Sequence, residues 1–158
     1  MSEISPENLT ALDNRYQATM TIYLTQIGLA VVLVLIGFFS PLNLEGSIPE
    51  NALMPLRVGV IFIAIASIVV RRLLLRWDRL QTVALLKGVR GLLSSLQSNA
   101  IILGVMAEIV AVLGFLIAAV SGVRAEILTF GGAALILFFL NFPRKPIWEK
   151  IVAKLENV

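Results

Sequence analysis

Four long apolar segments constrain this chain more than any other feature of its sequence. They cover residues 21–39, 52–70, 96–120 and 127–142 of the 158-residue chain. About 20 helical residues cross the hydrocarbon core of a membrane, so each segment is long enough, or nearly long enough, to span it. Lipid offers the backbone no hydrogen-bond partner, and such segments therefore fold as helices. The sequence predicts an all-α, integral membrane four-helix bundle that forms a single membrane domain over residues 1–158.

The composition supports a membrane protein and argues against most chemistry. Hydrophobic residues make up 58% of the chain and charged residues 15%, whereas a soluble domain is about 45–50% apolar. The chain has no Cys and no His, which excludes disulfides, thiolate chemistry, the usual zinc sites and histidine acid–base catalysis. It also lacks a Walker loop, a dinucleotide glycine fingerprint and a nucleophile elbow. We therefore expect no enzyme activity, no cofactor and no metal site.

The basic residues gather on one side of the predicted membrane. With both ends in the cytoplasm, the inner segments hold every one of the 13 Lys and Arg residues except Arg57 and Arg124. Positive charge near apolar spans marks the cytoplasmic side and attracts anionic lipid, so it does not indicate nucleic-acid binding. The pattern predicts cytoplasmic tails at residues 1–20 and 143–158, both termini cytoplasmic, and a cytoplasmic linker at residues 71–95.

The linker has a helical charge pattern of its own. On one continuous helix its basic side chains fall within an arc of about 80°. They are Arg72, Arg76, Arg79, Lys87 and Arg90. This pattern predicts a basic amphipathic helix at the membrane surface. Two interpretations remain open: a segment that only fixes topology and rests on lipid, or a surface that docks a soluble partner or a specific anionic lipid.

Small residues form a seam along the third apolar segment. They recur at alternating spacings of three and four, which places them on one face of a helix. They are Gly104, Ala107, Ala111, Gly114 and Ala118. Small side chains let membrane helices approach closely, so the sequence predicts a packing helix here. The packing partner is either another span or a second copy in a homo-oligomer.

Glu108 is the one charged residue inside the third apolar segment. A charge at mid-membrane costs about 2.5–3.5 kcal/mol and usually has a function, so Glu108 is a candidate proton or cation site that faces protein or water. Arg57 lies about 20 Å above the inner end of its span and Glu108 about 10–18 Å above the inner end of its own. A salt bridge between them is one interpretation. In the other, Arg57 extends to the outer interface and Glu108 is protonated.

Other polar residues within the spans are weaker signals. Thr25, Gln26, Ser67 and Thr129 lie among apolar neighbours. Such residues usually hydrogen-bond the backbone or another helix. We expect them to stabilise packing rather than to bind a ligand.

Two resemblances follow from these motifs. Residues 97–118 resemble the carboxylate helix of rotary ATPase proteolipids, the c subunits of F-type and V-type enzymes. In that family an Ala-Glu pair, followed by an apolar stretch and a Gly, holds the proton or sodium ion, and Glu108 is the matching residue. The whole chain is similar to uncharacterised bacterial four-span membrane proteins that share an Ala/Cys-Glu helix and a closing Asn/His-Phe-Pro-Arg, here residues 141–144. That similarity implies a fold and a location in the bacterial cytoplasmic membrane.

Three functions are consistent with the sequence. The first is a non-enzymatic, proteolipid-like membrane protein that binds a proton or cation at Glu108, alone or as an oligomer. The second is a structural or assembly protein in which Glu108 and Arg57 lock helices and the basic linker docks a partner or lipid. The third is a subunit of a small-solute transporter, which needs an oligomer to enclose enough volume. The expected partners are membrane lipid and a second copy or another membrane protein.

Overall fold

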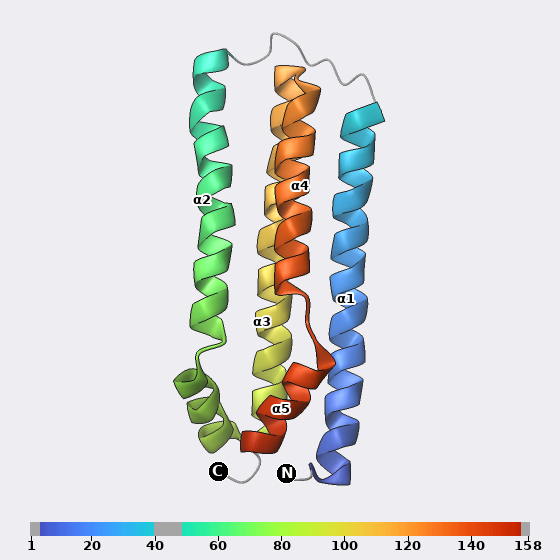
Figure 1. Cartoon of the computed structure of the whole chain (residues 1–158), viewed down its shortest axis with the longest axis vertical. Coiled ribbons are helices and arrows are strands. Elements are labelled where there is room, and N and C mark those ends of the chain that lie inside the picture. The colour runs from blue at the N-terminus through green and yellow to red at the C-terminus, as the bar shows by residue number, and fades with distance from the viewer. Residues whose placement is uncertain (1–3, 40–48, 156–158) are drawn as a thin grey trace.

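The structure is a computed structural model that describes residues 4–39 and 49–155, and five helices account for nearly all of these residues (Figure 1). The helices are α1 Pro6–Phe39, α2 Glu50–Leu74, α3 Trp77–Ser121, α4 Arg124–Asn141 and α5 Lys145–Leu155. The described ranges contain no β-strand. Four segments are long and apolar enough to cross a membrane: Pro6–Phe39, Asn51–Leu74, Trp77–Ser121 and Arg124–Leu155. The prediction of an all-α protein with four candidate spans is confirmed.

The helices form three layers (Figure 1). The pair α3 and α4 lies in the middle, α1 packs on one side of it and α2 on the other. Within the described residues, no Cα atom of α1 lies within 8 Å of a Cα atom of α2. The N-terminal end of α1, the α2–α3 connection and α5 all lie at one end of the bundle, which we call the terminal end. The α3–α4 turn lies at the other end, the distal end.

The bundle contains two cores, one above the other along α3. The core between the spans is built by Tyr23, Ala30, Val60, Ala107, Val110, Ala111, Ile117, Phe130, Ala134, Leu137 and Phe138. The core at the terminal end is built by Leu12, Leu80, Ala84, Leu92, Leu93, Leu96, Ala100, Trp148, Val152 and Leu155. Residues 88–121 of α3 extend about 51 Å at about 1.5 Å per residue, well beyond a hydrocarbon core of about 30 Å. The terminal end is therefore a helical extension of the membrane bundle.

The predicted N-terminal tail, residues 1–20, is largely part of this extension. α1 begins at Pro6 and continues into the first span without a break. Leu12 is fully buried in the terminal-end core, and the Tyr16 hydroxyl donates a hydrogen bond to the Pro143 carbonyl at 3.1 Å. Contacts with α3 and α5, rather than lipid, hold this part of the helix.

The predicted C-terminal tail, residues 143–158, contains α5. Its buried residues recur at helical spacing on one face: Trp148, Val152 and Leu155. The indole ring meets the Tyr16 ring edge-on, with centroids 5.6 Å apart. Lys145 Nζ lies 2.9 Å from Asp13 Oδ1 of α1, and this carboxylate raises the pKa of Lys145. α5 therefore packs across α1 and α3 instead of hanging free.

The basic linker is not the single amphipathic helix that the charge pattern predicts. Arg72 lies in the last turn of α2, and Arg76 caps the start of α3. Arg79 and Lys87 follow in the first turns of α3, and Arg90 lies beyond a kink at Gly88. The kink residue has φ 63° and ψ −171°. All five basic side chains are exposed, but they are spread over three helical pieces.

The kink at Gly88 gives a first prediction. This φ/ψ combination is essentially restricted to glycine and costs other residues about 1–3 kcal/mol, so we expect Gly88→Ala to lower the free energy of unfolding by that amount. The measurement is reversible unfolding of the purified protein in mixed micelles with increasing SDS. Gly59→Ala on α2 is the control, because its added Cβ meets nothing within 4 Å and Ala favours helix. Equal changes in the free energy of unfolding for the two substitutions would contradict a strained backbone at Gly88.

Candidate functional site

Glu108 lies partly buried near the middle of the part of α3 that faces the other spans. It is about 14 Å from Asn99, near the terminal-end limit of the spans, and about 20 Å from Ser121 at the distal end. Its neighbours Val105 and Ile109 are each 40% exposed on the outer face of the bundle. Across residues 4–39 and 49–155, no side chain forms a hydrogen bond or ion pair with the Glu108 carboxylate. The carboxylate is thus at mid-span and unpaired.

The small seam beside Glu108 is buried within the chain. All five residues, Gly104, Ala107, Ala111, Gly114 and Ala118, are buried. A Cβ built on Gly104 would meet Gln26 and Tyr23 of α1, and one built on Gly114 would meet Phe130 of α4. In the structure, this face of α3 packs against helices of the same chain. The seam is covered by α1 and α4, so a second copy would have to bind another face of α3.

Glu108 lies on the edge of α3 that faces α1. Gly104 packs against α1, and the Phe115 ring lies 3.1 Å from a Cβ built on Gly37 of α1. On a helical wheel Glu108 falls close to both residues and between their levels. The carboxylate is therefore at the border between the α1–α3 contact and the outer surface.

Gln26 is the polar side chain nearest to this border along α1. It is 9% exposed, and its Oε1 is buried without a hydrogen-bond donor in the described part of the chain. The same oxygen packs over Gly104, one helical turn before Glu108. A buried amide oxygen without a donor is unusual and costly. Sequence analysis placed Gln26 among the residues that stabilise packing and did not connect it with Glu108.

Arg57 pairs with Glu126 and not with Glu108. Its Nη2 donates to Glu126 Oε1, and the Ser121 hydroxyl donates to the other carboxylate oxygen at 3.1 Å. The Val123 backbone N–H in turn donates to Ser121 Oγ at 3.2 Å. This network joins α2 to the α3–α4 turn at the distal end of the bundle.

Depth explains why Arg57 and Glu108 do not meet. Asn99 Nδ2 donates to the Leu74 carbonyl at 3.2 Å, which puts these two residues at one level. From that level Arg57 is about 26 Å along α2 and Glu108 about 14 Å along α3. The remaining difference of about 12 Å is too long for an ion pair. The estimate from sequence ended the second span at residue 70, whereas α2 continues to Leu74.

The other polar residues of the spans have the expected packing contacts. The Thr25 and Thr129 hydroxyls donate to backbone carbonyls four residues earlier, at 2.9 Å each. Asn141 Nδ2 of α4 donates to Ser67 Oγ of α2 at 3.3 Å. The prediction that such residues hydrogen-bond the backbone or another helix is confirmed for Thr25, Ser67 and Thr129.

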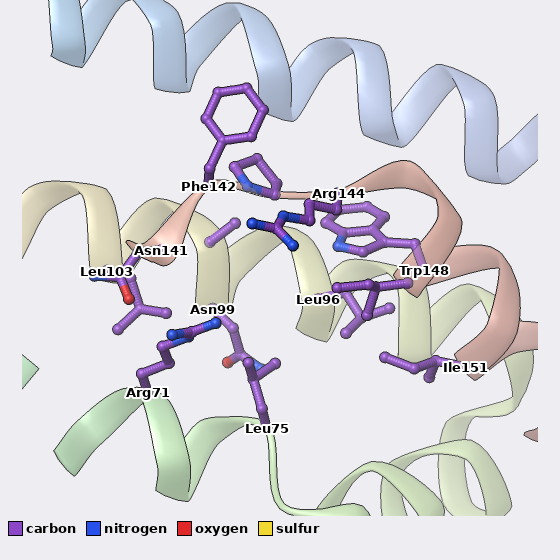
Figure 2. Close-up of a pocket in the computed structure, with 13 residues that line it drawn as sticks. Arg71, Leu75, Leu96, Asn99, Leu103, Asn141, Phe142, Arg144, Trp148 and Ile151 are labelled. Atoms are coloured by element: carbon purple, nitrogen blue, oxygen red, sulfur yellow. The ribbon is translucent and has the colours of Figure 1, made fainter. Parts of the chain in front are cut away.

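A pocket of about 60 Å³ lies where the spans meet the terminal end. It is enclosed by the end of α2, by α3, by the turn after α4 and by α5. Figure 2 shows Arg71 and Arg144 reaching into it from different elements, with Asn99 and Trp148 beside them. Every residue of the Asn-Phe-Pro-Arg motif, 141–144, lines this pocket. From the sequence, Arg71 and Arg144 count only as basic residues that mark the cytoplasmic side, and the Asn-Phe-Pro-Arg motif is the one sequence feature that sets Arg144 apart.

Comparisons of the chain with protein-family models, with curated proteins and with solved structures find no match.

Proposed function

We propose that the chain is a non-enzymatic multi-pass protein of the bacterial cytoplasmic membrane in which Glu108 takes up and releases a proton. The observation that carries this proposal is the unpaired, partly buried carboxylate in the middle of a span. An ionised carboxylate at that depth is costly, and protonation removes the charge. The resemblance of residues 97–118 to a proton-carrying helix supports the same role.

The surroundings of Glu108 favour binding of a proton over binding of a metal cation. Hard cations are held by about six or more oxygen ligands. The neighbours of Glu108 on the outer side of α3 are Val105, Ile109 and Val112, which provide no oxygen ligand from their side chains. One carboxylate is sufficient for a proton.

Gln26 provides a partner for the protonated form. Helical side chains lean towards the N-terminus of their helix, so the Glu108 carboxyl group leans towards Gly104, over which the Gln26 amide is packed. A protonated carboxyl group can donate to the Gln26 Oε1 that lacks a donor. An ionised carboxylate can instead accept from the amide N–H after a flip of the side chain. The same amide thus stabilises Glu108 in both protonation states.

The charge distribution supports a cytoplasmic location for the terminal end. This end carries all Lys and Arg residues of the chain except Arg57 and Arg124. By the positive-inside rule, the end with more basic residues stays in the cytoplasm. In this orientation both termini are cytoplasmic and the Arg57–Glu126 pair lies near the outer surface.

The test of the proposal is labelling of Glu108 with dicyclohexylcarbodiimide in nanodiscs, read by mass spectrometry. This apolar reagent reacts with protonated carboxyl groups, so we expect modification at Glu108 that falls as the pH rises. Glu108→Gln should remove this modification completely. Glu126→Gln is the matched control, because it removes a membrane carboxylate that is already paired, and it should leave the labelling of Glu108 unchanged.

Proton flux is the second measurement. In proteoliposomes with an imposed potassium diffusion potential, we expect the wild-type protein to change the pH of the lumen. With Glu108→Gln, the rate of this pH change should fall to that of empty liposomes. The variant must keep its unfolding midpoint for this comparison. A folded wild-type protein with neither labelling nor flux would overturn the proposal.

A structural or assembly role is the second candidate, and the Arg57–Glu126 pair favours it. This pair and its Ser121 contact join α2 to the α3–α4 turn, while exposed basic residues cover the terminal end. Exposed apolar residues on α2, such as Met54 at 61% and Phe62 at 67%, could face lipid, a second copy or another membrane protein. Native mass spectrometry from nanodiscs separates these cases. A ring of many copies would favour a proteolipid-like function, and a monomer or dimer without labelling would favour a structural one.

A further inference from the structure

The pocket at the terminal end of the spans lies at the level where a membrane meets water. It lies beside the ends of α2 and α4, where Arg71, Leu75 and Asn141 line it. The chain that follows each of these ends is rich in Lys and Arg, and Trp148 of α5 also lines the pocket. A molecule in this pocket would therefore contact water, the polar surface of the membrane and the ends of the apolar spans.

The pocket has positive charge without a compensating group. Arg71 and Arg144 line it, and its lining contains no Asp or Glu. Within residues 4–39 and 49–155, neither guanidinium group forms an ion pair or a side-chain hydrogen bond. Arg71 is partly buried, so its charge has lost part of its hydration. Arg144 is exposed. Both guanidinium groups line the pocket, and an anion bound between them would stabilise both positive charges.

The other residues that line the pocket provide hydrogen-bond donors and an apolar rim. Asn99 uses its amide to donate to the Leu74 carbonyl, and its other amide hydrogen is still available. The indole of Trp148 lies beside Arg144 (Figure 2) and provides a further N–H. Leu75 and Ile147 line the same pocket and are 40% and 47% exposed. The site therefore combines anion-binding groups with an apolar surface.

We propose that this pocket binds the phosphate of an anionic lipid headgroup between Arg71 and Arg144. Guanidinium groups bind phosphate oxygens through paired, charge-assisted hydrogen bonds. The apolar rim and the position at the end of the spans place the acyl chains of such a lipid along α2 and α4. Basic pockets between spans on the cytoplasmic side are suited to anionic headgroups. This site is independent of Glu108 and of its protonation.

The experiment measures phosphatidylglycerol binding to the full-length protein by native mass spectrometry from detergent, with zwitterionic phosphatidylcholine as the reference lipid. We expect wild type to retain phosphatidylglycerol and the Arg71→Gln/Arg144→Gln double variant to bind it at least about tenfold more weakly, as expected for the loss of charge-assisted hydrogen bonds. Lys150→Gln/Lys154→Gln is the matched control. It removes the same charge from exposed residues of α5 and should weaken binding by about threefold at most.

Further variants and a second ligand identify what the pocket binds and show whether lost binding is due to unfolding. Arg71→Lys and Arg144→Lys keep the charge but lose the guanidinium geometry, and each should weaken binding of phosphatidylglycerol while preserving the unfolding midpoint. Equal losses in the pocket and control double variants would overturn the site, because binding would then follow overall charge. Arginine-dependent binding of inorganic phosphate without binding of phosphatidylglycerol would overturn the lipid as its ligand.

Discussion

Gly114→Leu is expected to lower the free energy of unfolding by about 3 kcal/mol or to prevent folding of the bundle. A Cβ at this position would overlap Phe130 Cβ and lie 3.5 Å from Phe130 Cα. These atoms belong to the rigid start of a side chain and to the backbone of α4, so they cannot move without separating the two helices. Overpacking of this kind costs about 1–3 kcal/mol, and sometimes more. The measurement is reversible unfolding in mixed micelles with SDS.

Two glycines provide controls for this experiment. Gly132→Leu places the same side chain on α4 at a position where an added Cβ meets nothing within 4 Å, and we expect a small effect. Gly104→Ala should cost less than Gly114→Ala, since the nearest atom to its Cβ is the flexible end of the Gln26 side chain. If Gly114→Leu is as stable as Gly132→Leu, α3 and α4 do not pack as described.

Arg57→Leu is expected to destabilise the protein by about 3 kcal/mol. Removing one partner of a buried ion pair leaves the other charge buried and costs about 3–5 kcal/mol. We expect the lower end of this range because the Arg57 and Glu126 side chains are 26% and 14% exposed. Combining Arg57→Leu with Glu126→Gln should recover a large part of the loss. Unfolding of the four proteins in this double-mutant cycle gives the coupling energy directly.

A second cycle tests whether Arg57 acts on Glu108. Because these residues differ in depth by about 12 Å, we expect the effects of Arg57→Leu and Glu108→Gln to add within about 0.5 kcal/mol. Strong coupling of Arg57 to Glu108, with weak coupling to Glu126, would show that the ion pair of the structure is not the one that stabilises the bundle.

The spans could be predicted from sequence because apolar composition alone forces a helix in lipid. The extent of the helices could not be predicted in this way, since a polar segment such as residues 6–20 is held by its contacts with α3 and α5 and not by lipid. Leu12 offered little sequence signal among charged and polar neighbours. The spacing of Trp148, Val152 and Leu155 did contain a helical period, and it could have indicated α5 within the predicted C-terminal tail.

The candidate site was predictable only in part. Glu108 and the small seam could be identified because each depends on the composition of one helix. The ion pair of Arg57 and the surroundings of Gln26 and Arg71 could not be predicted, because they depend on the vertical offset between helices and on the turns that set it. An offset of one helical turn is about 5 Å, which is enough to exchange one ion-pair partner for another.

The lack of contact between α1 and α2 has a consequence for biosynthesis. Within an apolar stretch of 18 residues in each helix, only 11% of the residues of α1 and 17% of those of α2 are buried, compared with 44% of those of α3. When the ribosome has delivered the first two spans, they have no surface in common on which to associate. The two helices must remain separate in the lipid until α3 and α4 arrive between them. Folding of this bundle therefore follows completion of the chain, and a nascent protein that stops after α2 is left as two unassembled helices.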